Sequence, residues 1–255
     1  MELEQDRELI DDVMKVCLLA GKLMLMSGAE TYRVEDTMIR IAAAYGMDQS
    51  HSYVTPTGII FSLEGLETTE TKLIRIVERS TDLKQVTVVN SISRQISGGE
   101  MTVSQAYERL KEVEQKRQTF SLPIQTVAAA VIGGCFVIMF QGNWHDFIPA
   151  FLAGGVGFYS FMSIHKVIEI KFFAEFLASV FIGLLANVFV LTGIGQELDK
   201  IIIGSVMPLV PGLLITNAVR DLMAGHLVSG LSKGAEAFLT AFAIGSGIAV
   251  VFTIM

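Results

Sequence analysis

The distribution of apolar residues divides the chain near residue 121. Beyond that point, apolar windows alternate with short polar loops, and each window is long enough, at about 1.5 Å per residue, to cross a hydrocarbon core about 30 Å thick. Lipid cannot satisfy backbone polar groups, and the period-two pattern of a membrane barrel is absent, so the windows predict helices. The five predicted transmembrane helices cover residues 122–140, 147–164, 172–194, 201–219 and 235–255.

Residues 1–121 show the shorter, amphipathic patterns of a domain that faces water. Apolar positions recur with the helical period in four segments, two on each side of a central region rich in β-forming residues. Ser27 and Glu30 have the spacing of a capping box before the second segment, and Thr102 and Gln105 have the same spacing before the fourth. The four predicted helices cover residues 4–26, 30–45, 82–97 and 103–118.

The central region predicts a two-stranded antiparallel pair, formed by residues 51–63 and 72–78 around a polar turn. The sequence TPTG at residues 55–58 interrupts the first strand. It forms either a binding loop or an ordinary turn. The N-terminal domain, residues 1–121, therefore has the predicted order α-α-β-β-α-α.

Composition supports a division into a polar half and a membrane half. The chain of 255 residues is 51% hydrophobic and 18% charged, with a mean hydropathy of +0.54. Residues 1–121 hold 14 basic and 19 acidic side chains, whereas residues 122–255 hold 5 and 7. The net charge of −7 argues against a nucleic-acid partner, because phosphate binding depends on a basic face.

The basic residues beside the predicted spans indicate the orientation of the membrane half. By the positive-inside rule, short loops that carry Lys and Arg stay in the cytoplasm. The cations before the first span and in two later loops share one side; they are Arg109, Lys111, Lys116, Arg117, Lys166, Lys171, Arg220 and Lys233. The acidic N-terminus also lacks the pattern of a signal peptide. The predicted fold is an α-helical polytopic membrane protein with five transmembrane helices, an N-terminal cytoplasmic α+β domain and a C-terminus outside.

Small residues recur at four-residue spacing on the predicted membrane helices. Such stripes let helix backbones approach closely, which is how helices associate within lipid. They fit packing inside one bundle, or an interface to another subunit such as a second copy of the chain. The stripes are Ala130/Gly134, Ala150/Gly154, Ser179/Gly183 and Ala241/Gly245/Ala249.

The fourth predicted span contains the sequence PLVPG at residues 208–212, which predicts a helix broken near mid-membrane. In transporters, such breaks form substrate and ion sites. The polar residues that follow could hold a carboxylate or a zwitterion; alternatively, the break is a static kink, and Arg220 and Asp221 form a solvated anchor. The candidate substrate-binding residues are Pro208, Pro211, Gly212, Thr216, Asn217, Arg220 and Asp221.

Glu175 and His226 are candidates for proton coupling. Glu175 lies near one end of the third predicted span, where a carboxyl partly withdrawn from water suits proton exchange, although it could also reach the interface. His226 lies beside the polar cluster. Metal-binding, phosphate-loop and serine-hydrolase motifs are absent from the sequence, so we expect no catalytic residues, no metal, no cofactor and no enzymatic activity.

Three stretches resemble the threonine/serine exporter family: residues 27–46 (SGAETYRVEDTMIRIAAAYG), 54–62 (VTPTGIIFS) and 208–237 (PLVPGLLITNAVRDLMAGHLVSGLSKGAEA). The chain looks like the YjjP-like larger subunit of the split form, in which a smaller YjjB-like membrane subunit supplies the remaining spans. The resemblance implies export of L-threonine and L-serine, or of a dicarboxylate such as succinate, across the bacterial cytoplasmic membrane by an ion gradient. His226 stands where we expect an acidic residue in many members, which leaves threonine specificity open.

The first hypothesis is therefore a subunit of a secondary exporter. Arg220 would bind a carboxylate, and Thr216 and Asn217 would orient it. Asp221 would pair with an amine or with Arg220, and Glu175 would carry a proton. The alternative is a membrane-anchored metabolite sensor or enzyme whose spans only tether the soluble domain. The family-like positions are Pro208, Pro211, Gly212, Asn217, Arg220, Asp221, Gly225, Gly230 and Glu236.

Overall fold

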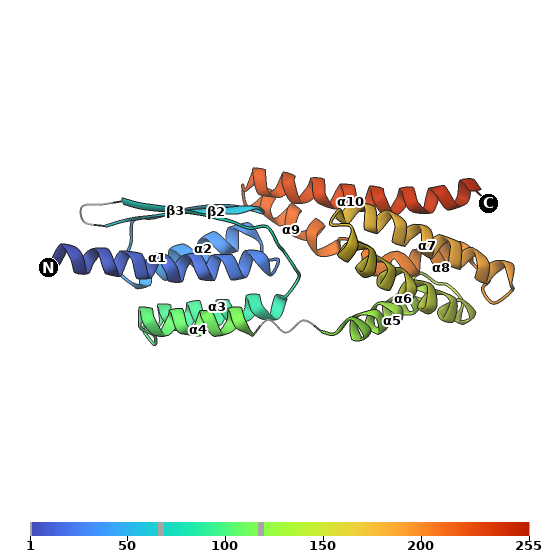
Figure 1. The fold of residues 1–255 in the computed structure, drawn as a ribbon, viewed down its shortest axis with the longest axis horizontal. Helices are drawn as coiled ribbons and strands as arrows, with labels where there is room; N and C mark the ends of the chain where they lie inside the picture. Colours follow the sequence, from blue (N-terminus) through green and yellow to red (C-terminus); the bar gives the residue numbers. More distant parts are fainter. Residues whose placement is uncertain (1, 66–68, 117–119, 255) are drawn as a thin grey trace. The chain divides into compact units, whose positions relative to one another are not determined.

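The computed structural model describes residues 2–65, 69–116 and 120–254 (Figure 1). The chain divides into two compact units. The first unit combines residues 1–118 with 213–234, and the second unit combines residues 119–212 with 235–255. A segment from the C-terminal half of the sequence is therefore part of the same unit as the N-terminal half.

Helices and a small sheet form three layers in the first unit. The helices α1 (Glu2–Met26) and α2 (Thr31–Ala44) form the middle layer, and both contact the sheet. The helices α3 (Leu83–Ser97) and α4 (Val103–Gln115) pack on the opposite side of this pair (Figure 1). Buried apolar side chains of all three layers form one core, which includes Met14, Leu23, Phe61, Ile96 and Leu110.

These four helices match the four predicted in the N-terminal half, with bounds that differ by a few residues. The predicted end of the last helix, residue 118, lies outside the described residues. The predicted capping box before α4 is confirmed. Thr102 Oγ1 accepts a hydrogen bond from the Gln105 N–H at 3.3 Å, and the Thr102 N–H donates to Gln105 Oε1 at 3.0 Å.

Helix α1 ends at a glycine in a left-handed conformation, and the turn between α1 and α2 contains no capping box. Gly28 has a φ of +86°, and the N–H groups of Gly28 and Ala29 donate to carbonyls of the last turn of α1 at 3.2 and 3.1 Å. This is the Schellman arrangement that glycine favours at a helix end. The predicted capping box is wrong because Glu30 is itself the N-cap of α2, and the Ser27 hydroxyl is hydrogen-bonded to the Gln85 side chain.

The described residues form an antiparallel sheet of three strands, in the order β1–β2–β3. They are β1 (Ser50–Thr55), β2 (Gly58–Glu64) and β3 (Thr69–Arg75). The prediction of two strands is wrong, because the first predicted strand is folded into a hairpin. Pro56 has no N–H to donate to a ladder, and Thr55 pairs with Gly58 across the turn. The TPTG segment is therefore a hairpin turn, and the order becomes α-α-β-β-β-α-α.

The second unit is a bundle of apolar helices. It contains α5 (Leu122–Met139), α6 (Trp144–Val167), α7 (Lys171–Leu191), α8 (Leu198–Val206), the 3-10 helix η1 (Met207–Leu209) and most of α10 (Leu227–Ile254). A Cβ added at Gly204 of α8 would lie 2.7 Å from the Gly133 carbonyl oxygen of α5. A Cβ added at Gly247 of α10 would lie 2.5 Å from the Phe176 carbonyl oxygen of α7. At these positions, small residues let helices of the same chain pack backbone to backbone.

Four of the described helices, α5, α6, α7 and α10, are long and apolar enough to cross a membrane. The pair Leu198–Leu209 and α9 (Gly212–Met223) passes the same test together, but it is bent by 62° at its break. The described residues therefore provide four spans, or five if the bent pair is one span, so the count of five stays a prediction. The predicted break is present, because η1 ends at Leu209 and α9 begins at Gly212.

The segment between the fourth and fifth predicted spans is mostly helical rather than a loop. Helix α9 continues to Met223, and α10 begins at Leu227 instead of residue 235. Between them, Gly225 has a φ of +88°, a conformation that lets α9 end sharply. The first turns of α10 carry Ser229 and Lys233, which are buried against polar partners of the first unit.

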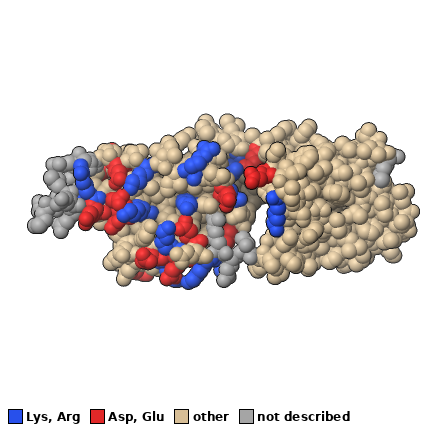
Figure 2. Space-filling view, viewed as in Figure 1, with Lys and Arg blue, Asp and Glu red and all other residues tan. Residues whose placement is uncertain are grey.

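Charged side chains gather on the first unit (Figure 2). In this view, lysine, arginine, aspartate and glutamate cover much of the first unit, whereas the visible face of the second unit is almost entirely uncharged. A charge facing hydrocarbon is costly, so the uncharged face suits contact with lipid.

Candidate functional site

Asp221 of α9 binds the N-terminal end of α2. Its Oδ1 accepts a hydrogen bond from the Thr31 backbone N–H at 2.9 Å, and its Oδ2 accepts one from the Thr31 hydroxyl at 2.9 Å. The first N–H groups of a helix have no partner within the helix, and the helix dipole favours an anion there. The start of α2 is therefore stabilised by a side chain that lies 190 residues later in the sequence.

Lys233 of α10 neutralises Asp221. Its Nζ lies 2.7 Å from Asp221 Oδ2 and 3.1 Å from the Thr31 hydroxyl oxygen, and the exposed fractions of the Lys233 and Asp221 side chains are 5% and 0%. A buried ion pair is tolerated when further hydrogen bonds satisfy its remaining donors and acceptors, as Thr31 does here. We call Thr31, Asp221 and Lys233 the buried clamp.

Asn217 and Arg220 bind the turn that precedes α2. Asn217 Nδ2 donates to the Gly28 carbonyl at 2.8 Å, and Arg220 Nη1 donates to Glu30 Oε1 at 2.5 Å. Arg33 pairs with the other oxygen of Glu30 at 3.2 Å. Burial alone would raise the pKa of Glu30, but a backbone hydrogen bond and the two guanidinium groups lower it below its ordinary value. The side chains of the buried clamp are buried, whereas the Arg220 side chain is 56% exposed.

His226 lies close to Glu35 and the end of β1. Its Nδ1 is 3.7 Å from Glu35 Oε1, which also accepts a hydrogen bond from the Val54 N–H at 2.8 Å. The Ser229 hydroxyl donates to the Val54 carbonyl at 3.0 Å. Burial raises the pKa of Glu35, although the Val54 N–H and His226 oppose this effect. The corner between α9 and α10 therefore contacts β1 as well as α2.

These contacts join the three stretches singled out in the sequence, residues 27–46, 54–62 and 208–237. The site residues predicted from the sequence that form these contacts lie in the last stretch, and their partners were not predicted. The partners are Glu30, Thr31, Glu35 and Lys233. Spacing gave no signal for Glu30, Thr31 and Glu35, because their partners are far away in the sequence, nor for Lys233, because its partner Asp221 lies on another helix. The shared resemblance was the available clue.

The predicted site residues are divided between the two units. Pro208, Pro211 and Gly212 belong to the second unit, and Thr216, Asn217, Arg220 and Asp221 belong to the first. Between Pro208 and Pro211, the backbone of Val210 is extended, with φ −65° and ψ 130°. Within the second group, Asn217 and Asp221 are buried, and Thr216 and Arg220 are exposed.

Glu175 lies in the second unit, whereas the other coupling candidate, His226, lies in the first. Glu175 Oε1 accepts a hydrogen bond from the Thr240 hydroxyl of α10 at 3.3 Å. Lys171 Nζ lies 3.8 Å from the same oxygen and 3.3 Å from Glu236 Oε1. The second unit thus has its own polar cluster, formed by α7 and α10.

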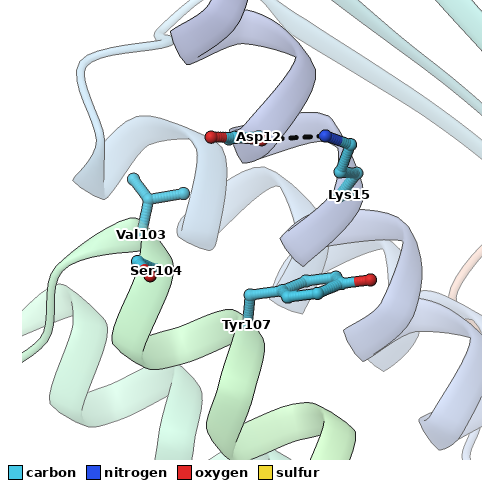
Figure 3. A pocket seen from close by; sticks show the side chains of 5 residues that line it. All are labelled: Asp12, Lys15, Val103, Ser104 and Tyr107. Carbon is cyan, nitrogen blue, oxygen red and sulfur yellow. Dashed lines mark hydrogen bonds and ion pairs between the residues drawn. The ribbon is translucent and has the colours of Figure 1, made fainter.

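A pocket of about 270 Å³ lies between α1 and α4 (Figure 3). Its lining residues are Asp12, Lys15, Val103, Ser104 and Tyr107. Lys15 Nζ pairs with Asp12 at 2.9 Å and with Asp11 at 2.7 Å, and Lys72 also pairs with Asp11, so the charges beside this pocket already neutralise one another. The predicted site residues are not among those that line it.

Comparison with known proteins decides the family. A family model described as "Putative threonine/serine exporter" matches residues 15–255. The chain belongs to the threonine/serine exporter family. The chain is similar to the "Probable succinate transporter subunit YjjP" of Escherichia coli (strain K12), with 26% identity over 100% of this chain and 97% of the relative.

Two longer relatives carry the name of exporters. The "Probable threonine/serine exporter" of Mycobacterium tuberculosis is 24% identical over 90% of this chain and 44% of its own length. The "Threonine/serine exporter" of Corynebacterium glutamicum is 21% identical over 95% of this chain and 51% of its own length. The chain spans about half the length of these two relatives. No solved structure matches it.

The family and the apolar helices together establish the general class of the protein. Its relatives are named as transporters and exporters, and the chain has several helices that are able to span a membrane. The chain is therefore a multi-pass membrane protein of an exporter family, and it is not an enzyme.

Proposed function

We propose that this chain is one subunit of a secondary exporter in the bacterial cytoplasmic membrane. It exports a small hydrophilic metabolite, either L-threonine and L-serine or a dicarboxylate such as succinate, and an ion gradient drives the export. The observation that carries the proposal is coverage: the chain spans 97% of a relative named as a succinate transporter subunit and 51% of a threonine/serine exporter. A smaller YjjB-like membrane subunit supplies the remaining half.

Arg220 is the residue to which we assign the carboxylate of the substrate. Both proposed substrate classes carry a carboxylate, and guanidinium binds this group with directed hydrogen bonds. Arg220 already binds a carboxylate, that of Glu30, while more than half of its side chain is exposed. A substrate carboxylate can therefore replace Glu30 on Arg220 without the burial of a new charge.

The neighbouring residues take two different roles in this proposal. Thr216, one turn before Arg220, is exposed and contributes its hydroxyl to the substrate. Asn217 and Asp221 are buried against the start of α2, so they position Arg220 by holding α9 in place. The helix is broken between Leu209 and Gly212, and in transporters such breaks form polar substrate and ion sites within the membrane.

The distribution of the cations supports the orientation that we propose. The first unit, with Arg220, lies on the cytoplasmic side, where the metabolite to be exported is present at high concentration. The N-terminus is cytoplasmic and the C-terminus lies outside if the bent helix pair is one span.

Efflux of labelled metabolites tests the proposal. Cells that express this chain together with its smaller partner should export L-threonine, L-serine or succinate faster than cells that express either subunit alone. Arg220→Ala should abolish this efflux, and Arg40→Ala should leave it unchanged, because Arg40 pairs with Asp36 on the surface of α2. Equal amounts of each variant in the membrane must be shown by immunoblot.

Two results would contradict the proposal. Unchanged efflux of all three metabolites on expression of both subunits would argue against an exporter of this substrate class. Efflux that persists in Arg220→Ala would leave the exporter proposal in place and remove Arg220 from the substrate site.

A further inference from the structure

Glu175 is a buried carboxylate of the second unit with one oxygen unsatisfied. It lies one turn after the start of α7, and its residue is 2% exposed. Thr240 donates to its Oε1, whereas its Oε2 is buried without a hydrogen-bond partner among the described residues. An ionised carboxylate with an unsatisfied oxygen in an apolar bundle is costly, so a contribution to stability does not account for this residue.

Lys171 is shared between two carboxylates. Its Nζ lies 3.3 Å from Glu236 Oε1 and 3.8 Å from Glu175 Oε1. When all three groups are ionised, the cluster carries one net negative charge, and one bound proton makes it neutral. Because a net charge withdrawn from water is costly, the neutral cluster is favoured. The proton belongs on Glu175, because the Glu236 side chain is 23% exposed and lies nearer to the ammonium group.

We propose that Glu175 binds and releases the proton that couples the ion gradient to export. The inference rests on the proposed function and names its coupling ion. On release, the O–H bond of the Glu175 carboxyl breaks, its electron pair stays on the carboxylate, and the proton passes to water. The Lys171 side chain is 39% exposed, so the cluster has a polar edge through which water reaches it.

The charges around Glu175 favour a proton over a metal cation. An ammonium group 3.8 Å away repels a metal ion, and hard cations need several oxygen ligands. Among the described residues, Lys171 is the cation that forms an ion pair with Glu175. Other titratable groups on the second-unit parts of the helices packed against α7 are His145, Asp146, Tyr159, His165 and Lys166 of α6, Asp199 and Lys200 of α8, and Glu236 of α10.

Proteoliposomes that contain this chain and its smaller partner provide the test. Accumulation of labelled L-threonine, L-serine and succinate is measured with an imposed pH gradient, and exchange of labelled for unlabelled substrate is measured at equal pH. Glu175→Gln should lose accumulation driven by the pH gradient and retain exchange, because the amide imitates a carboxyl that never releases its proton. The matched control is Glu169→Gln, an exposed position before α7, which should behave as the wild type.

The possible outcomes separate this inference from the proposed function. Accumulation by Glu175→Gln equal to that of Glu169→Gln would overturn the proton site, and so would loss of exchange in a correctly folded Glu175→Gln protein. If Glu175→Gln does not fold, Glu175→Asp replaces it, and an unchanged pH profile of accumulation would overturn the inference. Wild-type vesicles that transport none of the three metabolites would contradict the proposed function instead. In that case, infrared spectroscopy still tests the proton site, through a carboxyl band that Glu175→Gln should remove.

Discussion

Asp221 and Lys233 form an ion pair that solvent does not reach. Both carboxylate oxygens and the ammonium group have hydrogen bonds to one another or to Thr31. A buried pair of this kind adds little net stability compared with apolar residues of the same shape, but removal of one partner leaves an uncompensated charge. Asp221 therefore positions the start of α2 rather than offering a free carboxylate to a substrate.

We predict that Asp221→Ala lowers the stability of the protein by about 3–5 kcal/mol, because the buried Lys233 ammonium loses its counter-charge. Thermal unfolding of the purified protein in detergent measures the effect as a lower Tm. The double variant Asp221→Ala/Lys233→Met should recover a large part of the loss, because it removes both charges.

Asp36→Ala is the control for this prediction. The Asp36 side chain is 62% exposed and pairs with Arg40 on the surface of α2, so its removal should change stability by no more than about 0.5 kcal/mol. An Asp221→Ala protein that unfolds at the wild-type temperature would show that the pair is not buried in the folded protein.

At the residue scale, one side of the candidate site was predictable from the sequence. The spacing of Asn217 and Asp221 places both on one face of a helix, and both are in fact buried on one side of α9. Their partners Gly28 and Thr31 could not be deduced from spacing, because the docking of a turn against a distant helix is a tertiary event. Lys233 was predicted to be a cation of a cytoplasmic loop, although it lies in α10 and is 4% exposed.

At the scale of elements, the sequence predicted helices well and the sheet less well. Apolar periodicity located α1 to α4, and long apolar windows located α5 to α7, within a few residues, because a long pattern averages out local exceptions. The hairpin of β1 and β2 was missed, because both strands are rich in β-forming residues and together they look like one strand. The start of α10 was missed for another reason: its first turns mix polar and apolar residues, and the polar side chains of Ser229 and Lys233 are buried against other parts of the protein.

The turn at Gly28 allows a matched test of one element. Gly28 and Gly46 both have positive φ, at +86° and +83°, so alanine at either position should cost about 1 kcal/mol of strain. We predict similar decreases in Tm for Gly28→Ala and Gly46→Ala, but reduced efflux for Gly28→Ala alone, because the Gly28 carbonyl accepts the hydrogen bond of Asn217. Equal efflux by the two variants would show that the geometry of this turn does not matter for transport.

At the scale of the whole molecule, the bent helix pair decides the topology. If Leu198–Leu209 and α9 form one span, the chain crosses the membrane five times; if they do not, it crosses four times. An odd number places the two termini on opposite sides, and an even number places them on the same side.

We predict that reporter fusions find the termini on opposite sides. A C-terminal reporter that is active only outside the cytoplasm should be active, and an N-terminal reporter that fluoresces only inside the cytoplasm should fluoresce. The same C-terminal reporter placed at the end of α6 should be inactive, which provides the internal control. An inactive reporter at the C-terminus of the full chain would favour four spans and contradict the predicted orientation.

The first unit is assembled from two separate parts of the sequence. Residues 213–234 belong to it, although residues of the second unit lie on both sides of them in the chain. A fragment that ends at residue 121 therefore lacks Asn217, Asp221 and Lys233, and it exposes the polar groups that these side chains bind. For this reason, the N-terminal half alone is unsuitable for binding assays, including those that would test whether the chain is a membrane-anchored metabolite sensor.

The buried clamp also imposes an order on biosynthesis. Thr31 and Lys233 are 202 residues apart in the chain. At roughly 5–20 residues per second, Lys233 leaves the ribosome about 10–40 s after Thr31. Throughout this interval, the N-terminal end of α2 stays open while the helices of the second unit are inserted into the bilayer. A nascent chain that stalls before residue 221 keeps this end unfilled, and one that stalls before residue 233 leaves Asp221 without its counter-charge, so the cell's proteases can recognise such an unfinished protein before it joins a partner.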